Sequence, residues 1–186
     1  MKVIGLTGTI GSGKEVVKDT LMRKFNSYYV TLSDIIRAEI ERKRNKLTRT
    51  TLQDMGDEMR QKYGPHILAM LAVEYLGRDK ELIIVDGIRN PSEAEYLRKK
   101  FGNNFKLIGV DAPAEIRFER VKNRNRSEEP RTWEEFLASD ERDQGKNEPP
   151  TGLQVRKCLE QADFQVVNDG SIEDLQKKID ELVKSI

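Results

Sequence analysis

Residues 8–14, Gly-Thr-Ile-Gly-Ser-Gly-Lys, have the spacing of a phosphate-binding loop, G-x-x-x-x-G-K. The glycines allow successive backbone N–H groups to point at one anion, because glycine adopts conformations that other residues avoid. Lys14 adds a positive charge for the outer phosphates, and the helix that follows adds the positive end of its dipole. The alternative is a glycine-rich turn with an incidental lysine. The order of strand, loop, lysine and helix favours a site for nucleotide phosphates.

Glu15 occupies the position after the lysine, where the motif commonly has Ser or Thr as a magnesium ligand. A carboxylate can bind magnesium, but it also places a negative charge beside a polyphosphate. Glu15 therefore argues against GTPase and motor types more than against nucleotide binding, and its contact with the metal is left open. The residues predicted to bind the nucleotide here are Gly8, Thr9, Gly11, Ser12, Gly13, Lys14 and Glu15.

Asp86 directly follows residues 82–85, which are apolar throughout, as a parallel strand buried on both faces requires. An acid at the end of such a strand commonly holds magnesium through water, the alternative being a simple strand-terminal cap. Parallel sheets bind ligands beyond the carboxyl ends of their strands, so polar residues at other strand ends are expected to share this site. These residues are Ser33, Asp34, Asn168 and Asp169.

Arginines stand close to these strand ends. Arg89 lies three residues past Asp86, and Arg37 lies one turn into the helix after the second strand, where a guanidinium could face a phosphate. Three more arginines share one helix face before a polar, proline-broken segment at 126–150. Such a stripe is more often solvated, but this setting predicts a mobile basic lid over phosphates. The arginines of the helix and the segment are Arg117, Arg120, Arg124, Arg126, Arg131 and Arg142.

The elements that must position these groups alternate between strands and helices. Apolar runs predict strands at 2–7, 28–32, 82–85, 106–110 and 164–167. Alternation of this kind predicts a parallel α/β sheet with helices on both faces. Ser33 and Asp34 are expected to cap the helix after the second strand. Helices are expected at 14–25, 35–40, 48–63, 65–76, 91–101, 113–125, briefly near 133–137, from 153 and at 172–183.

Composition limits the possible functions. The 186 residues suit one domain, and 33 basic against 32 acidic side chains leave a formal charge of +1, which gives no global attraction to nucleic acid or to an anionic membrane. Cys158 is the only cysteine, so no disulfide framework exists, and His66, the only histidine, excludes His-dependent triads and multi-His metal sites. No run approaches the roughly 20 apolar residues of a membrane span. A cytoplasmic monomer or dimer is expected.

Four stretches resemble a known family. Residues 82–97, with Asp86-Gly87 and Arg89, resemble the strand-Asp-Gly-x-x-Arg stretch of adenylate kinase, and residues 32–37 resemble the start of its acceptor-binding helices. Residues 110–124 are similar to the strand and arginine helix that lead into its lid. Residues 162–171 resemble the loop over the donor's adenine in nucleoside monophosphate kinases and dephospho-CoA kinases. The chain is similar to the P-loop nucleoside monophosphate kinase group, near adenylate-kinase-related archaeal proteins and phage deoxynucleotide kinases.

This resemblance implies a three-layer P-loop NTPase fold with a five-stranded parallel sheet in the order 2-3-1-4-5. It implies one kinase domain over 1–186, an acceptor-binding helical insertion at 33–77, a lid-like segment at 126–150, and ATP and Mg²⁺ as cofactors. Asp86 would hold the metal through water. The residues that would act on the transferred phosphoryl group or its acceptor are Lys14, Arg89, Arg120, Arg124 and Arg142. The acceptor would be bound by Ser33, Arg37, Arg60, Asp86 and Arg89. The nucleotide would be contacted by Asn168, Asp169 and Gly170.

The activity expected from these residues is ATP-dependent phosphorylation of a nucleoside or deoxynucleoside monophosphate. A first alternative is a dephospho-CoA kinase, whose hydroxyl acceptor needs a general base, with Asp34 in that role. A second is a nucleotide-binding regulator or chaperone-like ATPase. The expected partner in each case is a small-molecule nucleotide, with no nucleic acid and no membrane.

Overall fold

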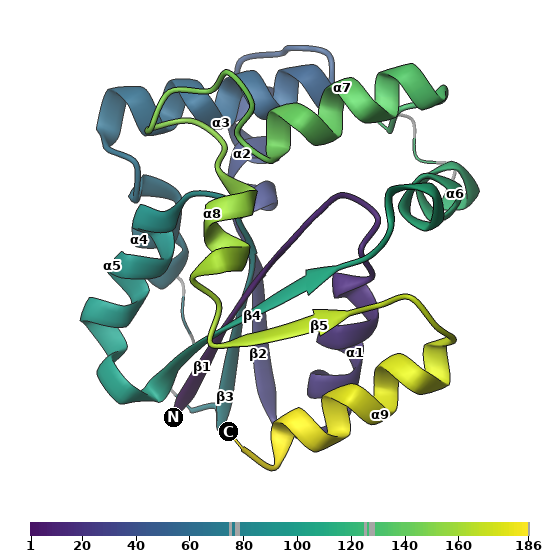
Figure 1. Ribbon diagram of the computed structural model, residues 1–186. Coiled ribbons are helices and arrows are strands. Elements are labelled where there is room, and N and C mark those ends of the chain that lie inside the picture. Colours follow the sequence, from purple (N-terminus) through teal and green to yellow (C-terminus); the bar gives the residue numbers. More distant parts are fainter. Residues whose placement is uncertain (75, 77–78, 125, 127–128, 186) are drawn as a thin grey trace.

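The computed structural model describes residues 1–74, 76, 79–124, 126 and 129–185. These residues form one parallel sheet in the order β2-β3-β1-β4-β5, which confirms the predicted sheet and its order (Figure 1). The strands are β1 (Lys2–Gly8), β2 (Ser27–Thr31), β3 (Leu82–Ile88), β4 (Phe105–Asp111) and β5 (Phe164–Val167). Residues 75, 77, 125, 127 and 128, at expected helix ends and in the predicted lid segment, lie outside the described residues.

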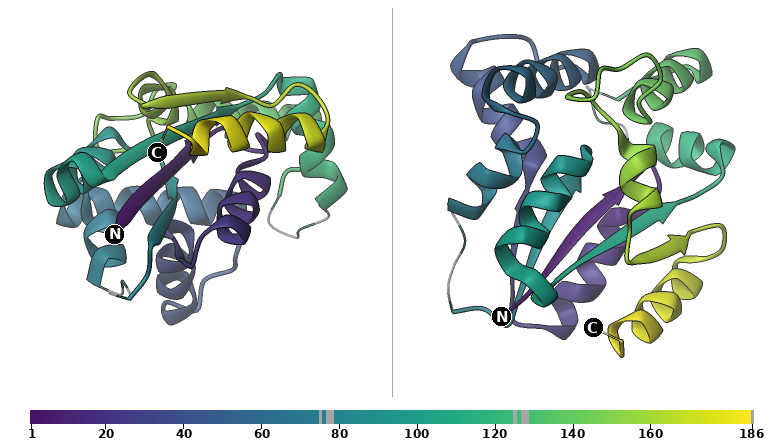
Figure 2. Two further views of the ribbon diagram at one scale, coloured as in Figure 1. Left: turned by 90° about the horizontal axis from the view of Figure 1, so that it is seen from below. Right: turned by 60° about the vertical axis from the view of Figure 1, so that its left-hand side comes forward.

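Helices cover both faces of the sheet because the central strands are apolar on both sides. Leu82 and Ile84 of β3 enter a core with α1 (Lys14–Lys24) and α9 (Ile172–Val183). Ile83 and Val85 enter the opposite core, which is covered by α4 (Ile67–Glu74), α5 (Pro91–Phe101) and α8 (Val155–Glu160). Figure 2 shows these layers from two further directions. A short 3₁₀ helix, η1 (Gly102–Asn104), joins α5 to β4.

Three helices lie across the carboxyl ends of the strands, at the top of Figure 1. They are α2 (Leu32–Arg42), α3 (Arg49–Tyr63) and α7 (Trp133–Asp143), and α6 (Ala114–Arg124) stands beside them. The sequence predicted only a short helix near 133–137, whereas α7 has 11 residues and starts at a capping box of Thr132 and Glu135. Its Phe136 is fully buried against Ile10 and Val121, so α7 packs directly on the loop after β1.

Two predicted boundaries at the strand ends were wrong. Thr31 is the N-cap of α2, and its hydroxyl accepts a hydrogen bond from the Ser33 N–H at 3.3 Å, so Ser33 and Asp34 lie in the first turn. Strand β2 leaves no room for a later cap, because it runs straight into the helix. Strand β3 continues past Asp86 to Ile88. Gly87, with a φ of +83°, is skipped in the pairing with β1, so Asp86 pairs with Leu6 and Ile88 pairs with Thr7.

Candidate functional site

A pocket of about 420 Å³ opens at the carboxyl ends of β1, β2 and β3. The loop after β1 forms its floor, α2 and the start of α3 form one wall, and Arg124, Arg126, Glu129 and Asp143 complete the lining. The structure therefore brings together most of the predicted site residues. The charged or polar side chains that line it are Ser12, Lys14, Glu15, Lys18, Tyr29, Thr31, Ser33, Asp34, Arg37, Arg49, Asp86, Arg89, Arg124, Arg126, Glu129 and Asp143.

The loop itself has the backbone that an anion site needs. Gly13 adopts a left-handed conformation with a φ of +98° and is the N-cap of α1, without a side chain that satisfies the first N–H groups of the helix. A Cβ on Gly13 would stand 2.2 Å from the Asn168 amide nitrogen, so a larger residue would collide there. These free N–H groups and the dipole of α1 together favour a phosphate at this end of the helix.

Lys14 lies against the loop that precedes it. Its ammonium donates hydrogen bonds to the carbonyls of Gly8 at 2.8 Å and Thr9 at 3.0 Å. Burial is the main cause that lowers the pKa of Lys14 to about 8; Asp86 opposes this shift, and Arg89 contributes to it. A bound polyphosphate would favour the charged form, because opposite charges within a few ångströms stabilise one another.

Asp86 has one carboxylate oxygen held and one left without a partner. Oδ2 accepts a hydrogen bond from the Tyr29 hydroxyl at 3.0 Å, while Oδ1 is buried and unpaired. No group of three or more His, Cys, Asp or Glu side chains among the described residues could hold a metal by itself. Asp86 therefore fits an ion such as Mg²⁺ that keeps several waters and shares the nucleotide's phosphates.

The wall opposite the loop carries a charged cluster that the sequence reasoning missed in part. Arg49, at the start of α3, donates to the Asp143 carboxylate from the end of α7. Asp143 also accepts from Gln53 at 2.8 Å, and the Arg89 guanidinium stands 3.7 Å from it. Burial alone would raise the pKa of Asp143, but Arg49 and Arg89 hold it below its usual range. No local pattern marked Arg49 or Asp143 as site residues.

Two further ion pairs cross the mouth of the pocket. Arg124, the last residue of α6, lies 3.5 Å from Glu129. Arg126 lies 3.5 Å from Glu15, the residue that replaces the usual Ser or Thr of the motif. Both guanidiniums line the pocket on the side of the loop, where they could approach the outer phosphates of a bound nucleotide.

Asn168, predicted to contact the nucleotide, and Arg120, predicted to act on the transferred phosphoryl group, do not line the pocket. The Asn168 amide is 5% exposed and donates to the Ser12 carbonyl at 2.8 Å. Arg120 in turn donates to the Asn168 carbonyl at 3.2 Å and to its side-chain oxygen at 3.3 Å. Both residues brace the loop from outside the pocket. Asp169 pairs with Lys178, and Gly170 follows it outside the lining.

Thr9, predicted to bind the nucleotide, likewise lies outside the lining. Its hydroxyl donates to the Asp111 carboxylate at 2.6 Å. Arg117 is buried and forms an ion pair with Asp140, so it does not share an accessible face of α6 with Arg120 and Arg124. Periodicity placed Arg117 beside Arg120 and Arg124, but α7 covers it.

Arg60 was predicted to bind the acceptor, but it is 1% exposed and lies outside the pocket. Its guanidinium donates to Glu93 at 2.9 Å and to Asp57 at 3.4 Å. Glu93 is the first-turn acid of the capping box of α5 and also accepts from the Arg89 N–H at 2.8 Å. The Arg60–Glu93 pair therefore joins α3 to the backbone that carries Arg89.

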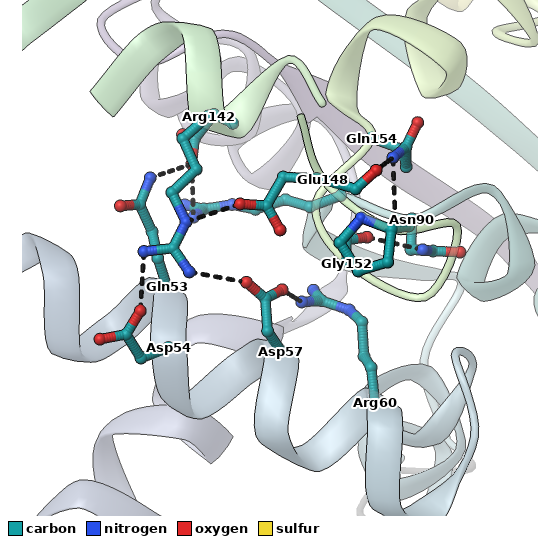
Figure 3. A network of polar contacts seen from close by, with 12 residues as sticks. Gln53, Asp54, Asp57, Arg60, Asn90, Arg142, Glu148, Gly152 and Gln154 are labelled. Atoms are coloured by element: carbon teal, nitrogen blue, oxygen red, sulfur yellow. Dashed lines mark hydrogen bonds and ion pairs between the residues drawn. The ribbon is translucent and has the colours of Figure 1, made fainter. Parts of the chain in front are cut away.

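Arg142 reaches from α7 to three carboxylates, as Figure 3 shows. Its nitrogens lie 2.7 Å from Asp54, 2.9 Å from Asp57 and 2.9 Å from Glu148. Burial raises the pKa of Asp57 to about 6, although Arg60 and Arg142 pull in the opposite direction. We call Arg142 with Asp54, Asp57 and Glu148 the Arg142 latch. It fastens the predicted lid to α3, and each guanidinium nitrogen of Arg142 contacts one of the three carboxylates.

Comparison with protein families agrees with this geometry. Residues 4–144 match the family model described as an AAA domain. A UPF0200 protein of Methanocaldococcus jannaschii is 31% identical over 189 residues that cover 100% of this chain and 91% of that one. A UPF0200/UPF0201 protein of Archaeoglobus fulgidus is 35% identical over 186 residues, but the match spans 98% of this chain and only 55% of that longer protein.

Two solved structures with a similar fold are named as small-molecule kinases. A shikimate kinase of Acinetobacter baumannii, solved with shikimate, has a TM-score of 0.57 at 19% identity over 100% of this chain and 94% of that one. A gluconokinase of Sinorhizobium meliloti has a TM-score of 0.54 at 14% identity over 99% and 94% of the two chains. At such low identity the likeness shows the fold alone. None of the helices in the described part of the chain combines the length and the apolar character needed to traverse a bilayer.

Proposed function

Since the chain belongs to the AAA domain family and to the UPF0200 proteins, we propose that it transfers a phosphoryl group from ATP to a nucleoside or deoxynucleoside monophosphate. One observation carries the proposal. One pocket is lined both by the phosphate-binding loop and by a group of arginines. That arrangement suits two phosphate-bearing substrates that face each other.

The donor side is formed by the loop, Lys14 and Asp86. The backbone N–H groups of the loop and the Lys14 ammonium hold the outer phosphates. Mg²⁺, when bound, would neutralise developing charge on the phosphates, with Asp86 positioning it through water. Arg124 lines this side and is the arginine of α6 that can stabilise the transferring group.

The acceptor side is formed by Arg37, Arg49 and Arg89. Guanidinium groups bind phosphate through paired hydrogen bonds, which position the acceptor as well as neutralise it. A phosphate acceptor is already largely ionised near neutral pH, so no general base is required. Asp143, the last residue of α7, lines the pocket beside Arg49 and Arg89, so a bound acceptor would be shielded on this side from water, which could otherwise take the phosphoryl group.

A hydroxyl acceptor is the second candidate, because Asp34 also lines the pocket. A hydroxyl must lose a proton as it attacks, and a carboxylate beside it can act as the base. Two solved structures of similar fold are kinases named for shikimate and for gluconate, neither of which is a nucleotide. Dephospho-CoA would be an acceptor of this hydroxyl class.

The deciding experiment measures ADP release from ATP and Mg²⁺ with a panel of nucleoside monophosphates, deoxynucleoside monophosphates and dephospho-CoA. Mass spectrometry identifies each product. We expect a monophosphate to become a diphosphate, and Lys14→Ala to abolish transfer. Acceptor-independent ADP release, with no phosphorylated product from any compound, would refute the proposal and favour a nucleotide-dependent regulator.

Asp34→Asn separates the two kinase readings on the best acceptor. Thr31 caps α2, so this substitution leaves the cap intact. With a phosphate acceptor we expect kcat to fall by less than about tenfold. With a hydroxyl acceptor, loss of the general base would lower kcat by about 10²–10⁴. A loss above about a hundredfold with an unchanged melting temperature would overturn the monophosphate proposal.

A further inference from the structure

Tyr29 and Asp86 lie on neighbouring strands and on the same face of the sheet. In the parallel register of β2 and β3, Thr31 pairs with Asp86 and Tyr29 pairs with Ile84. Side chains two residues apart along a strand point the same way, so Tyr29 reaches along β3 toward Asp86. Its hydroxyl donates to Asp86 Oδ2 at 3.0 Å. No motif of the nucleotide site includes this tyrosine.

We propose that Tyr29 is a positioning residue for the metal, because it holds Oδ2 of Asp86 and leaves Oδ1 for a water of the nucleotide-bound Mg²⁺. This inference rests on the proposed function, since the metal would arrive with ATP. Asp86 Oδ1 is buried without a hydrogen-bond partner, and both Asp86 and Tyr29 line the pocket. A buried, unpaired carboxylate oxygen is costly unless a ligand satisfies it.

The surroundings of the phenol keep it a hydrogen-bond donor. An ordinary tyrosine hydroxyl carries its proton near neutral pH, and Asp86 Oδ2 accepts from this one at 3.0 Å. The Lys18 ammonium stands 5.2 Å from the centre of the Tyr29 ring and helps to fix its place. Without the hydroxyl, the terminal torsion of Asp86 is broad and its two oxygens can exchange.

The test measures the effect of magnesium on nucleotide binding rather than on turnover. Isothermal titration gives the Kd of a non-hydrolysable ATP analogue, the β,γ-imido compound, in excess Mg²⁺ and in EDTA. We call the ratio of the two Kd values the magnesium effect. We expect Tyr29→Phe to reduce the magnesium effect about tenfold, since partners of metal-facing groups commonly contribute 10–100-fold to metal affinity. Binding in EDTA should stay within about twofold of wild type.

Tyr28→Phe is the matched control, because Tyr28 is the adjacent residue of β2 but packs into the opposite core. It should leave the magnesium effect unchanged, whereas Asp86→Asn should reduce it at least as much as Tyr29→Phe. Tyr29→Met, which keeps an apolar side chain without a donor, serves if the phenylalanine variant does not fold.

The outcomes separate this inference from the proposed function. If Tyr29→Phe keeps the wild-type magnesium effect and only its melting temperature falls, the hydrogen bond to Asp86 is structural. This result would overturn the inference and leave the proposed function standing. Wild-type protein that binds the ATP analogue in neither condition would overturn the proposed function and this inference with it.

Discussion

Glu93→Gln is expected to lower the free energy of unfolding by about 3 kcal/mol, because it removes the main counter-charge of a buried arginine. Glu93 is 0% exposed and Arg60 is 1% exposed. The Glu93 carboxylate accepts from Arg60 at 2.9 Å, from the Arg89 N–H at 2.8 Å and from the Asn90 N–H at 3.0 Å. A glutamine amide has one oxygen, so it cannot accept from both the guanidinium and the backbone.

The magnitude follows from what remains beside Arg60. Breaking a buried ion pair on one side destabilises a protein by roughly 3–5 kcal/mol. Asp57 lies 3.4 Å from Arg60 and keeps part of the compensation, which places the expected loss at the lower end. For a chain of this length, about 3 kcal/mol corresponds to a fall in Tm of about 6–12 °C.

The assay is urea unfolding followed by circular dichroism at pH 7.5. Glu95→Gln is the matched control, because Glu95 lies on the same helix and is exposed; it should change the unfolding free energy by less than about 0.5 kcal/mol. The double variant Arg60→Met, Glu93→Gln should lose less than the sum of its single variants, since no unpaired charge remains. A loss below about 1 kcal/mol in Glu93→Gln would refute the reasoning.

Three more predictions concern the pocket and its cover. Lys14 has a pKa of about 8 and must be charged to hold phosphate, so affinity for the ATP analogue should fall roughly tenfold per pH unit above pH 8. If Lys14→Arg shows a similar fall in affinity, the titrating group is not Lys14. Arg142→Lys should speed hydrogen exchange in α7, because one ammonium cannot contact all three carboxylates of the Arg142 latch. An unchanged exchange rate would show that the Arg142 latch does not hold α7 in place. Arg89→Ala should weaken acceptor binding by roughly 2–4 kcal/mol and ATP much less, measured as Kd values; equal losses would make Arg89 structural.

Local sequence was sufficient for the floor of the site. The loop and Lys14 are contiguous, and Asp86 and Arg89 stand three residues apart at the end of an apolar strand. The parallel sheet follows from alternating apolar runs and helices, and its order is the one that the family resemblance implied. These features could be predicted because each depends on neighbours in the chain or on the general rule that strand ends of one polarity meet at one edge.

Only the tertiary structure decided which charged residues face the pocket. Arg49 and Asp143 lie 94 residues apart in the sequence, and their contact exists because α7 packs against α3. Arg117 of α6 is buried against Asp140 of α7, and Arg60 of α3 is buried against Glu93 of α5. Periodicity had placed Arg117 on the arginine face of its helix, and the family resemblance had implied that Arg60 binds the acceptor. Periodicity states which side of a helix a charge occupies. Whether that side meets solvent, substrate or a counter-charge depends on an element far away in the chain. Arg117 and Arg60 lie outside the pocket because each is buried against its own carboxylate.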